Sequence, residues 1–218
     1  RAKYILIHLD HDLLVVHLKM TGRLYVAGDN EYSDSDRWAH VKFQLDRGRQ
    51  LRFSDSRKFG FVSLVSRIED IAPHLGPEPL SDDFTIAEFT ARLARHHKSI
   101  KALLLDQAFL AGVGNIYADE SLHLAKIHPL RAADQLTAAE IARLYEAIRV
   151  ILAHAIDREG ASVSWYRKPD GTSGDAQNHF AVYDRSGLAC LTCGSPIEKS
   201  RVAQRGTHYC PTCQPISD

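Results

Sequence analysis

The sequence predicts an α+β protein of two domains, an antiparallel β-sandwich followed by a helical domain that ends in a four-cysteine module. Three observations predict it: short runs of branched and aromatic residues up to about Ser66, a helical period of apolar residues beyond a Pro-rich acidic segment, and four cysteines confined to the C-terminal part of the chain. The 218 residues are 44% hydrophobic and 25% charged, with 27 basic and 27 acidic residues. This balance is typical of a globular protein, and it gives no bulk charge that would indicate a nucleic-acid partner.

The first domain is expected over residues 1–70. Five runs have the composition of short strands: KYILIHL, LLVVHLKM, AHVKFQL, LRFSD and FGFVSLV. Asp10–Asp12 and Asp46–Gly48 have the composition of tight hairpin turns, and Ala27–Asp36 is polar enough for a loop. Because hairpins join neighbouring antiparallel strands, we expect an antiparallel sandwich.

Residues 71–84, which are rich in proline and acidic side chains, are expected to form a linker, and residues 85–160 a helical domain. Two capping boxes and a terminal glycine mark its helices: Thr85 with Glu88, Thr137 with Glu140, and Gly160. In the longer helix apolar residues recur at i, i+3, i+4 and i+7, which predicts one buried face. The polar, turn-rich segment 161–182 is longer than an ordinary connection, which is typical of a functional loop.

The last expected domain, residues 183–218, contains the pattern C-x2-C-x16-C-x2-C, formed by Cys190, Cys193, Cys210 and Cys213. This spacing predicts two thiolate hairpins that close one tetrahedral Zn²⁺ site. Two disulfides or an iron site are the alternatives. Disulfides are rare in the cytosol, the compartment we expect because the sequence shows neither a signal peptide nor a membrane span. A site with four protein ligands keeps no position open for water, so the metal is predicted to be structural.

Two features predict contacts with phosphate. The expected hairpin tip of the cysteine module places the guanidinium of Arg205 beside Gly206, which permits close backbone approach. In LAGVGNIYADE, Gly112 and Gly114 interrupt a helical pattern and Asn115 begins the next helix, so backbone N–H groups and a side-chain amide form an anion pocket. An ordinary interhelical turn is the alternative. Nearby basic side chains favour the anion pocket: Lys101, His96, His97 and Lys98.

Four segments resemble motifs of the formamidopyrimidine-DNA glycosylase and endonuclease VIII family: HLKMTGRL, DSRKFG, LLLDQAFLAGVGNIYADESL and RGTHYCPTCQ. The first two resemble DNA-facing loops of the family's N-terminal domain, the third its helix-two-turn-helix, and the fourth the end of its zinc finger. The resemblance covers the chain from Ala2 to Gln214. It implies DNA held across the cleft between the two domains, removal of an oxidised base, and cleavage of the abasic strand.

The resemblance also implies roles for single residues. Met20 resembles the residue that fills the gap left by an extruded base, Arg57 the one that faces the orphaned partner base, and Phe59 the wedge between neighbouring bases. Strand packing is the alternative for Met20 and Phe59. Segment 161–182 resembles the mobile loop that closes over the flipped base. Residues that resemble phosphate-gripping or backbone-facing positions are Lys3, His96, Lys98, Lys101, Asn115, Tyr183 and Arg205, of which we place Lys3 and Arg205 at the reacting nucleotide.

The chain departs from the family pattern in three places. The family's nucleophile is an N-terminal proline with a glutamate beside it as acid, whereas this chain starts at Arg1. An internal lysine, with an unperturbed pKa of about 10.4, is a poor substitute, so we expect a longer protein with an upstream segment that begins Met-Pro-Glu. Arg37-Trp38-Ala39-His40 stands where the family often shows Arg-His-x-His. His96 stands where a lysine is common, which predicts a phosphate contact that weakens when the imidazole loses its proton.

We therefore predict a DNA glycosylase with abasic-site lyase activity on oxidised purines such as 8-oxoguanine and formamidopyrimidines. The wide separation of Met20 from Arg57 and Phe59 favours this branch over the pyrimidine-directed one. Two alternatives stay open: an endonuclease VIII-type enzyme for oxidised pyrimidines, and a non-catalytic zinc-ribbon protein that binds damaged DNA. The expected cofactor is Zn²⁺, and the expected partner is double-stranded DNA with oxidised bases or abasic sites, bound by a monomer in the bacterial cytoplasm.

Overall fold

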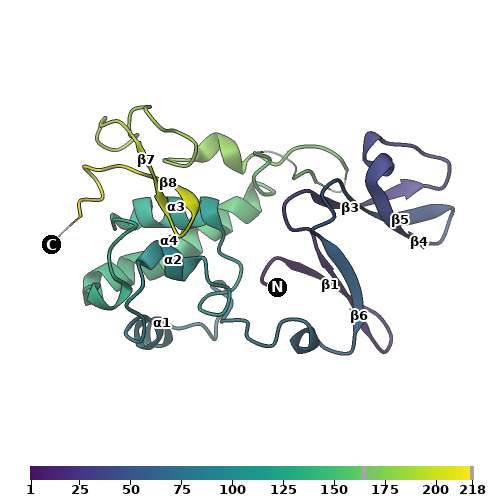
Figure 1. Cartoon of the computed structure of the whole chain (residues 1–218), viewed down its shortest axis with the longest axis horizontal. Coiled ribbons are helices and arrows are strands. Elements are labelled where there is room, and N and C mark those ends of the chain that lie inside the picture. The colour runs from purple at the N-terminus through teal and green to yellow at the C-terminus, as the bar shows by residue number, and fades with distance from the viewer. Residues whose placement is uncertain (164–165, 169, 217–218) are drawn as a thin grey trace. The chain divides into compact units, whose positions relative to one another are not determined.

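The computed structural model describes residues 1–163, 166–168 and 170–216, and it divides into two compact units. The first unit contains Arg1, Lys3–Pro73 and Arg158–Gln177; the second contains Ala2, His74–Asp157 and Asn178–Asp218. Figure 1 follows the chain from the purple strands of the first unit to the yellow hairpin near the C-terminus. The predicted α+β class is confirmed, with strands first, helices next and the cysteines last.

Two three-stranded antiparallel sheets make up the core of the first unit (Figure 1). In spatial order, one contains β1 (Tyr4–His8), β2 (Leu13–His17) and β6 (Phe61–Val65), and the other contains β3 (Gly22–Gly28), β5 (Arg49–Asp55) and β4 (Ala39–Gln44). The sequence predicted five of these strands and both hairpin turns. Strand β3 was missed because glycines begin and end it, and glycine is depleted in strands.

A buried ion pair fixes the loop that was expected at Ala27–Asp36. Arg52 on β5 donates to the Asp36 carboxylate at 2.9 Å and to two backbone carbonyls of the loop, Gly28 O at 2.8 Å and Glu31 O at 2.7 Å. The loop ends in a short 3₁₀ helix, η1 (Asp34–Trp38), and a second one, η2 (Ile68–Asp70), follows β6. Because each charged group is paired and hydrogen-bonded, this loop has a defined conformation.

Four α-helices form the core of the second unit: α1 (Ile86–Leu93), α2 (Ile100–Leu104), α3 (Asn115–Ala125) and α4 (Ala138–Asp157). Both predicted capping boxes contribute side-chain caps, since Glu88 N donates to Thr85 Oγ1 and Thr137 N donates to Glu140 Oε2. The predicted apolar face of α4 is buried or half-buried against α1 and α3. The unit also contains the short 3₁₀ segment η3 (Ala133–Gln135), and the last one, η4 (Ala176–His179), begins in the first unit and ends in the second.

The C-terminal hairpin consists of β7 (Glu198–Val202) and β8 (Arg205–Tyr209), and β8 packs against α3. Ala203 and Gln204 form the tip with φ of 48° and 60°, as a two-residue hairpin turn that matches strand twist requires. The sequence predicted the tip near Gln204, Arg205 and Gly206; in the structure Arg205 and Gly206 are the first two residues of β8, directly after the tip. In the described part of the chain, no helix is long and apolar enough to cross a membrane.

Candidate functional site

The four cysteines form one cluster in which all Sγ atoms lie within 4.8 Å of one another. The Cys193–Cys210 sulfurs are 3.4 Å apart and the Cys190–Cys213 sulfurs 3.9 Å apart. A tetrahedral zinc with Zn–S bonds of about 2.3 Å separates its sulfurs by about 3.8 Å, whereas a disulfide needs about 2.05 Å. The donor set and its spacing therefore fit a structural zinc ion and not two disulfides.

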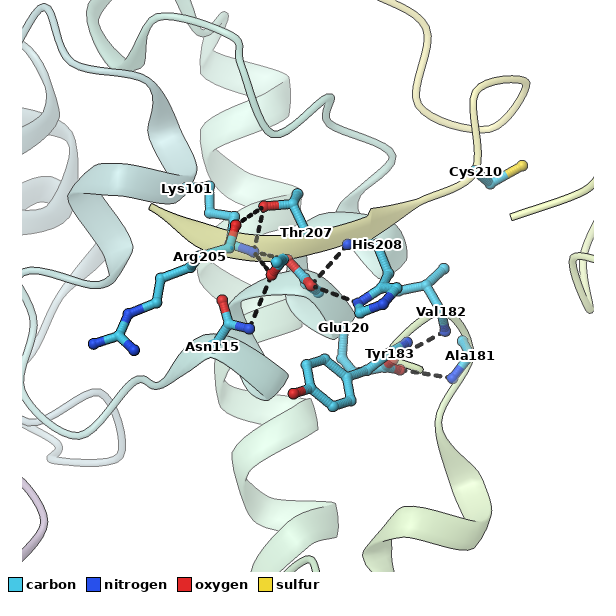
Figure 2. Close-up of polar contacts among 12 residues, drawn as sticks. Lys101, Asn115, Glu120, Ala181, Val182, Tyr183, Arg205, Thr207, His208 and Cys210 are labelled. Atoms are coloured by element: carbon cyan, nitrogen blue, oxygen red, sulfur yellow. Dashed lines mark hydrogen bonds and ion pairs between the residues drawn. The ribbon is translucent and has the colours of Figure 1, made fainter. Parts of the chain in front are cut away.

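A buried ion pair braces the hairpin β7–β8, which lies between the second and third cysteines of this cluster. Lys101 Nζ on α2 lies 2.6 Å from Asp119 Oδ1 on α3, and neither side chain has any exposed surface. The same ammonium donates to Thr207 Oγ1 at 2.8 Å and to Gly206 O at 3.0 Å, both on β8 (Figure 2). Asp119 Oδ2 in turn accepts from His208 N at 2.9 Å. Two helices thus hold three successive residues of β8 through one cation and one carboxylate.

Burial dominates the electrostatics of this pair. It raises the pKa of the Asp119 carboxyl to about 6, although the Lys101 ammonium acts to lower it. Burial also lowers the pKa of Lys101, against the attraction of Asp119. Each charge is therefore stabilised by its partner, and removing either side chain alone would leave the other charge buried and unpaired, which destabilises the fold.

The brace leaves the guanidinium of Arg205 available to a ligand. Arg205 is the first residue of β8 and is exposed. In Figure 2 its guanidinium points away from the network of dashed contacts. The site thus combines a fixed backbone with a free-standing cation at the hairpin tip.

The glycine turn before α3 is joined to the same hairpin. Asn115 Nδ2 donates to Gly206 O at 2.9 Å, and Gly112 N donates to the Gln107 side chain at 2.9 Å. Gly112 has φ of +86°, a conformation that glycine adopts without strain. The first i to i−4 hydrogen bond of α3 runs from Ala118 N to Gly114 O. The N–H groups that precede Ala118 therefore have no acceptor inside the helix.

Glu120 is a further organising residue that the sequence did not reveal. Its buried carboxylate accepts from three successive backbone N–H groups, those of Ala181, Val182 and Tyr183, at 2.7–2.9 Å (Figure 2). The Tyr183 ring packs edge-on against His208, with ring centroids 5.0 Å apart. These contacts place Tyr183 beside β8. They join residues that are far apart in the sequence, so only the folded structure shows them.

Two predicted basic residues lie near the end of α1. His96 packs edge-on against the Phe109 ring at 5.7 Å, and the exposed Lys98 ammonium lies 3.8 Å from the Asp106 carboxylate. Lys98 therefore has a weak surface ion pair that a phosphate can replace. The segment 161–182, expected to cap a flipped base, includes Ser164, Trp165 and Pro169, which lie outside the described residues, as do residues 217–218 at the end of the expected zinc-finger domain.

In the first unit, the predicted base-facing residues lie on two neighbouring loops. Met20 and Phe59 are 60% and 58% exposed, and Arg57 Nη1 lies 3.9 Å from Met20 Sδ. Strand packing, the alternative for Met20 and Phe59, is therefore wrong. Lys3 is also exposed, in a left-handed conformation with φ of 71°, just before β1.

Asp55, at the end of β5, locks these two loops together. Its carboxylate accepts from Gly60 N at 2.7 Å, from Arg57 N at 3.1 Å and from the Thr21 hydroxyl. A Cβ at Gly60 would lie 2.7 Å from His17 O, so only glycine fits there. The motif DSRKFG carried a signal for this role, because aspartate commonly caps the backbone two residues ahead in a turn.

Three family models match the chain in order: the formamidopyrimidine-DNA glycosylase N-terminal domain over residues 1–62, the formamidopyrimidine-DNA glycosylase H2TH domain over 75–167, and the zinc finger found in FPG and IleRS over 187–216. The chain belongs to the formamidopyrimidine-DNA glycosylase family. The predicted resemblance is thus confirmed.

Named relatives cover nearly all of this chain. The formamidopyrimidine-DNA glycosylase of Herpetosiphon aurantiacus is 54% identical over 98% of the chain and 79% of its own length. The one of Symbiobacterium thermophilum is 49% identical over 100% and 72%. Among solved structures, Lactococcus lactis Fpg with abasic-site DNA superposes with a TM-score of 0.90 at 38% identity, covering 99% of this chain and 80% of that one. MutM (Fpg) from Thermus thermophilus gives 0.89 at 43% identity, with 99% and 81% covered.

Within this formamidopyrimidine-DNA glycosylase chain, the structure brings together two sets of the predicted residues. Met20 and Arg57 meet in the first unit. In the second unit, Lys101 and Asn115 both contact the residue after Arg205. The residues that hold these sets in place, Asp55, Asp119, Glu120 and Thr207, were not predicted.

Proposed function

We propose that the chain acts in base-excision repair as a DNA glycosylase with abasic-site lyase activity on oxidised purines in double-stranded DNA. The observation that carries this proposal is the loop pair of the first unit, in which the exposed Met20 lies beside the Arg57 guanidinium and the exposed Phe59 follows on the same backbone, fixed by Asp55. Extruding a base costs a few kcal/mol of stacking, and an apolar plug with a planar donor offsets part of it. Met20, Phe59 and Arg57 supply these groups.

Solved relatives support this substrate class. One Lactococcus lactis Fpg variant was solved with DNA containing Fapy-dG, and MutM was solved with DNA containing carbocyclic 8-oxo-G. Both lesions are oxidised purines. A strand-cleavage assay of the protein as its gene encodes it tests the assignment, and we expect duplexes with 8-oxoguanine to be cut faster than duplexes with thymine glycol. Preference for thymine glycol would instead establish the pyrimidine-directed alternative.

For the second unit, we propose that Arg205, Asn115, Tyr183, His96 and Lys98 face the DNA backbone, and that Lys3 does so in the first unit. Lys101 has protein partners for its ammonium, so we propose that it acts indirectly by holding Gly206 and Thr207 in place. We also propose that Cys190, Cys193, Cys210 and Cys213 bind Zn²⁺ with no open coordination position. The metal then supplies rigidity and no chemistry of its own.

Phe59→Ala is expected to lower the affinity for a duplex with an abasic-site analogue by about tenfold, because a wedge against a base contributes about 1–3 kcal/mol. Affinity for undamaged duplex should change little, since that DNA keeps its stack. Fluorescence anisotropy with the two duplexes measures both. Leu64→Ala, which removes an equally exposed apolar side chain from β6, is the matched control. Equal losses for both duplexes would exclude the wedge role.

Arg205→Ala is expected to weaken binding to lesion and undamaged duplexes alike by about tenfold, and to reduce the slope of log K against log salt by about 1. Phosphate contacts carry no sequence information, so selectivity for the lesion should persist. The exposed Arg201 on the same hairpin provides the control substitution Arg201→Ala, which should leave the slope close to that of the parent chain. Unchanged binding by Arg205→Ala would remove Arg205 from the interface.

A further inference from the structure

Helix α3 presents a polar side chain at every fourth position to the cysteine module: Asn115, Asp119 and His123. Residues four apart lie on one face of a helix, where apolar side chains normally seal a core. Here each of the three contacts the C-terminal segment. Asn115 bonds Gly206 O and Asp119 bonds His208 N, while His123 Nε2 lies 3.6 Å from Cys190 Sγ. The first two contacts brace the hairpin; the third reaches the metal cluster itself.

The His123 contact is enclosed. His123 is 7% exposed and Cys190 is 3% exposed, so water does not compete for the sulfur from this side. The same sulfur accepts from Thr192 N at 3.4 Å, in the manner of a thiolate held by backbone amides. A thiolate bound to a metal has no proton to donate, so a hydrogen bond at this distance needs the proton on His123 Nε2.

We propose that His123 donates an Nε2–H···Sγ hydrogen bond to the Cys190 thiolate and thereby slows the loss of Zn²⁺ from the four-cysteine cluster. This inference rests on the proposed binding of Zn²⁺. A zinc ion with four thiolates has a net charge of −2, and donors to sulfur spread that charge within a buried site. Groups that orient and polarise a ligand in this way commonly change metal affinity by about 10–100-fold when they are removed.

The position of His123 gives this bond a second consequence. It comes from the last turn of the helix whose first residue, Asn115, holds Gly206 near the start of β8. Helix α3 is thus tied to the module at the start of β8, in the middle of β8 and at the proposed metal site. Loss of the His123 bond should therefore weaken the retention of the metal before it disturbs the position of Arg205.

Metal release tests the proposal without DNA and without enzyme activity. The zinc-loaded chain is mixed with the chelator 4-(2-pyridylazo)resorcinol, and the rate of Zn²⁺ transfer is followed by absorbance. His123→Phe, which keeps a ring of similar size and lacks the donor, should release Zn²⁺ about 10–100-fold faster than the parent chain. His128→Phe is the matched control, because His128 is a buried histidine of the same unit whose ring packs on Tyr209. The range of about 10–100-fold applies to groups that contact a metal ligand. Because the His128 ring instead packs on Tyr209, the release rate of this variant should stay within about twofold of the parent rate.

An unchanged release rate in His123→Phe would overturn the proposal. A parent chain that binds no Zn²⁺ would overturn the proposed metal site itself, an outcome that metal analysis of the purified chain distinguishes. Should His123→Phe not fold, the unmutated zinc-loaded chain still decides the question. Long-range ¹H–¹⁵N NMR of its histidines should show the Nε2–H tautomer for His123, whereas the Nδ1–H tautomer would exclude the bond. With Co²⁺ in place of Zn²⁺, a four-thiolate spectrum is expected, and a three-thiolate, one-imidazole spectrum would make His123 a ligand instead of a donor.

Discussion

Asp119→Ala is expected to destabilise the second unit by about 3–5 kcal/mol, the usual result of removing one partner from a buried ion pair. The Lys101 ammonium has no exposed surface, so the substitution leaves a cation in a site without water. It also removes the acceptor of His208 N from the middle of β8. Urea unfolding of the zinc-loaded chain measures the change. Glu88→Ala provides the control, because Glu88 forms a half-exposed pair with Arg92 at 3.7 Å, and its loss should cost no more than about 1 kcal/mol.

A double substitution separates stability from positioning. Lys101→Met combined with Asp119→Leu removes both buried charges, and most of the lost stability should return because apolar residues of similar size replace such pairs well. Gly206 O and Thr207 Oγ1 still lose their cation, so binding to lesion DNA should remain weaker than in the parent chain. A double variant that binds DNA as tightly as the parent chain would show that the brace serves only stability. An Asp119→Ala variant within about 1 kcal/mol of the parent chain would show that the pair is no brace at all.

Removal of the metal is expected to unfold the C-terminal module and to lower affinity for DNA by at least about 100-fold. The apolar core of the module is too small to persist alone, since its buried cluster contains only Val182, Cys190, Ile197 and Cys210 among the described residues. In such a domain the free energy of metal binding, about 10–16 kcal/mol in zinc-finger peptides, supplies the free energy of folding. Arg205 then loses its fixed backbone together with the hairpin.

Circular dichroism and anisotropy after treatment with a chelator measure folding and binding on the same sample. Added Zn²⁺ should restore both, and Cys213→Ser should reproduce the loss without a chelator. Thr192→Ala serves as the control, because Thr192 contributes only its backbone N–H to Cys190 Sγ. A chelated chain that still binds lesion DNA with its original affinity would contradict the role given to the module.

Several elements followed from local sequence alone. The two capping boxes fixed the starts of α1 and α4, and runs of branched and aromatic residues located five strands, because both signals act over a few neighbouring residues. The spacing of the cysteines located the cysteine cluster, since two C-x2-C turns can meet at one site. The strand β3, bounded by glycines, gave too weak a local signal.

The residues that organise the site depended on tertiary structure. Asp119 meets His208 across 89 positions of sequence, and Lys101 meets Thr207 across 106. Lys101 could be predicted as a basic residue near phosphate, but no periodicity shows that its charge is buried and paired. Glu120 likewise accepts from backbone N–H groups that lie 61 to 63 positions away in the sequence. Propensity, capping and ligand spacing are local properties that the sequence by itself determined. The partner of a buried charge is decided only when distant segments pack and exclude water, because a charge without water needs a partner there.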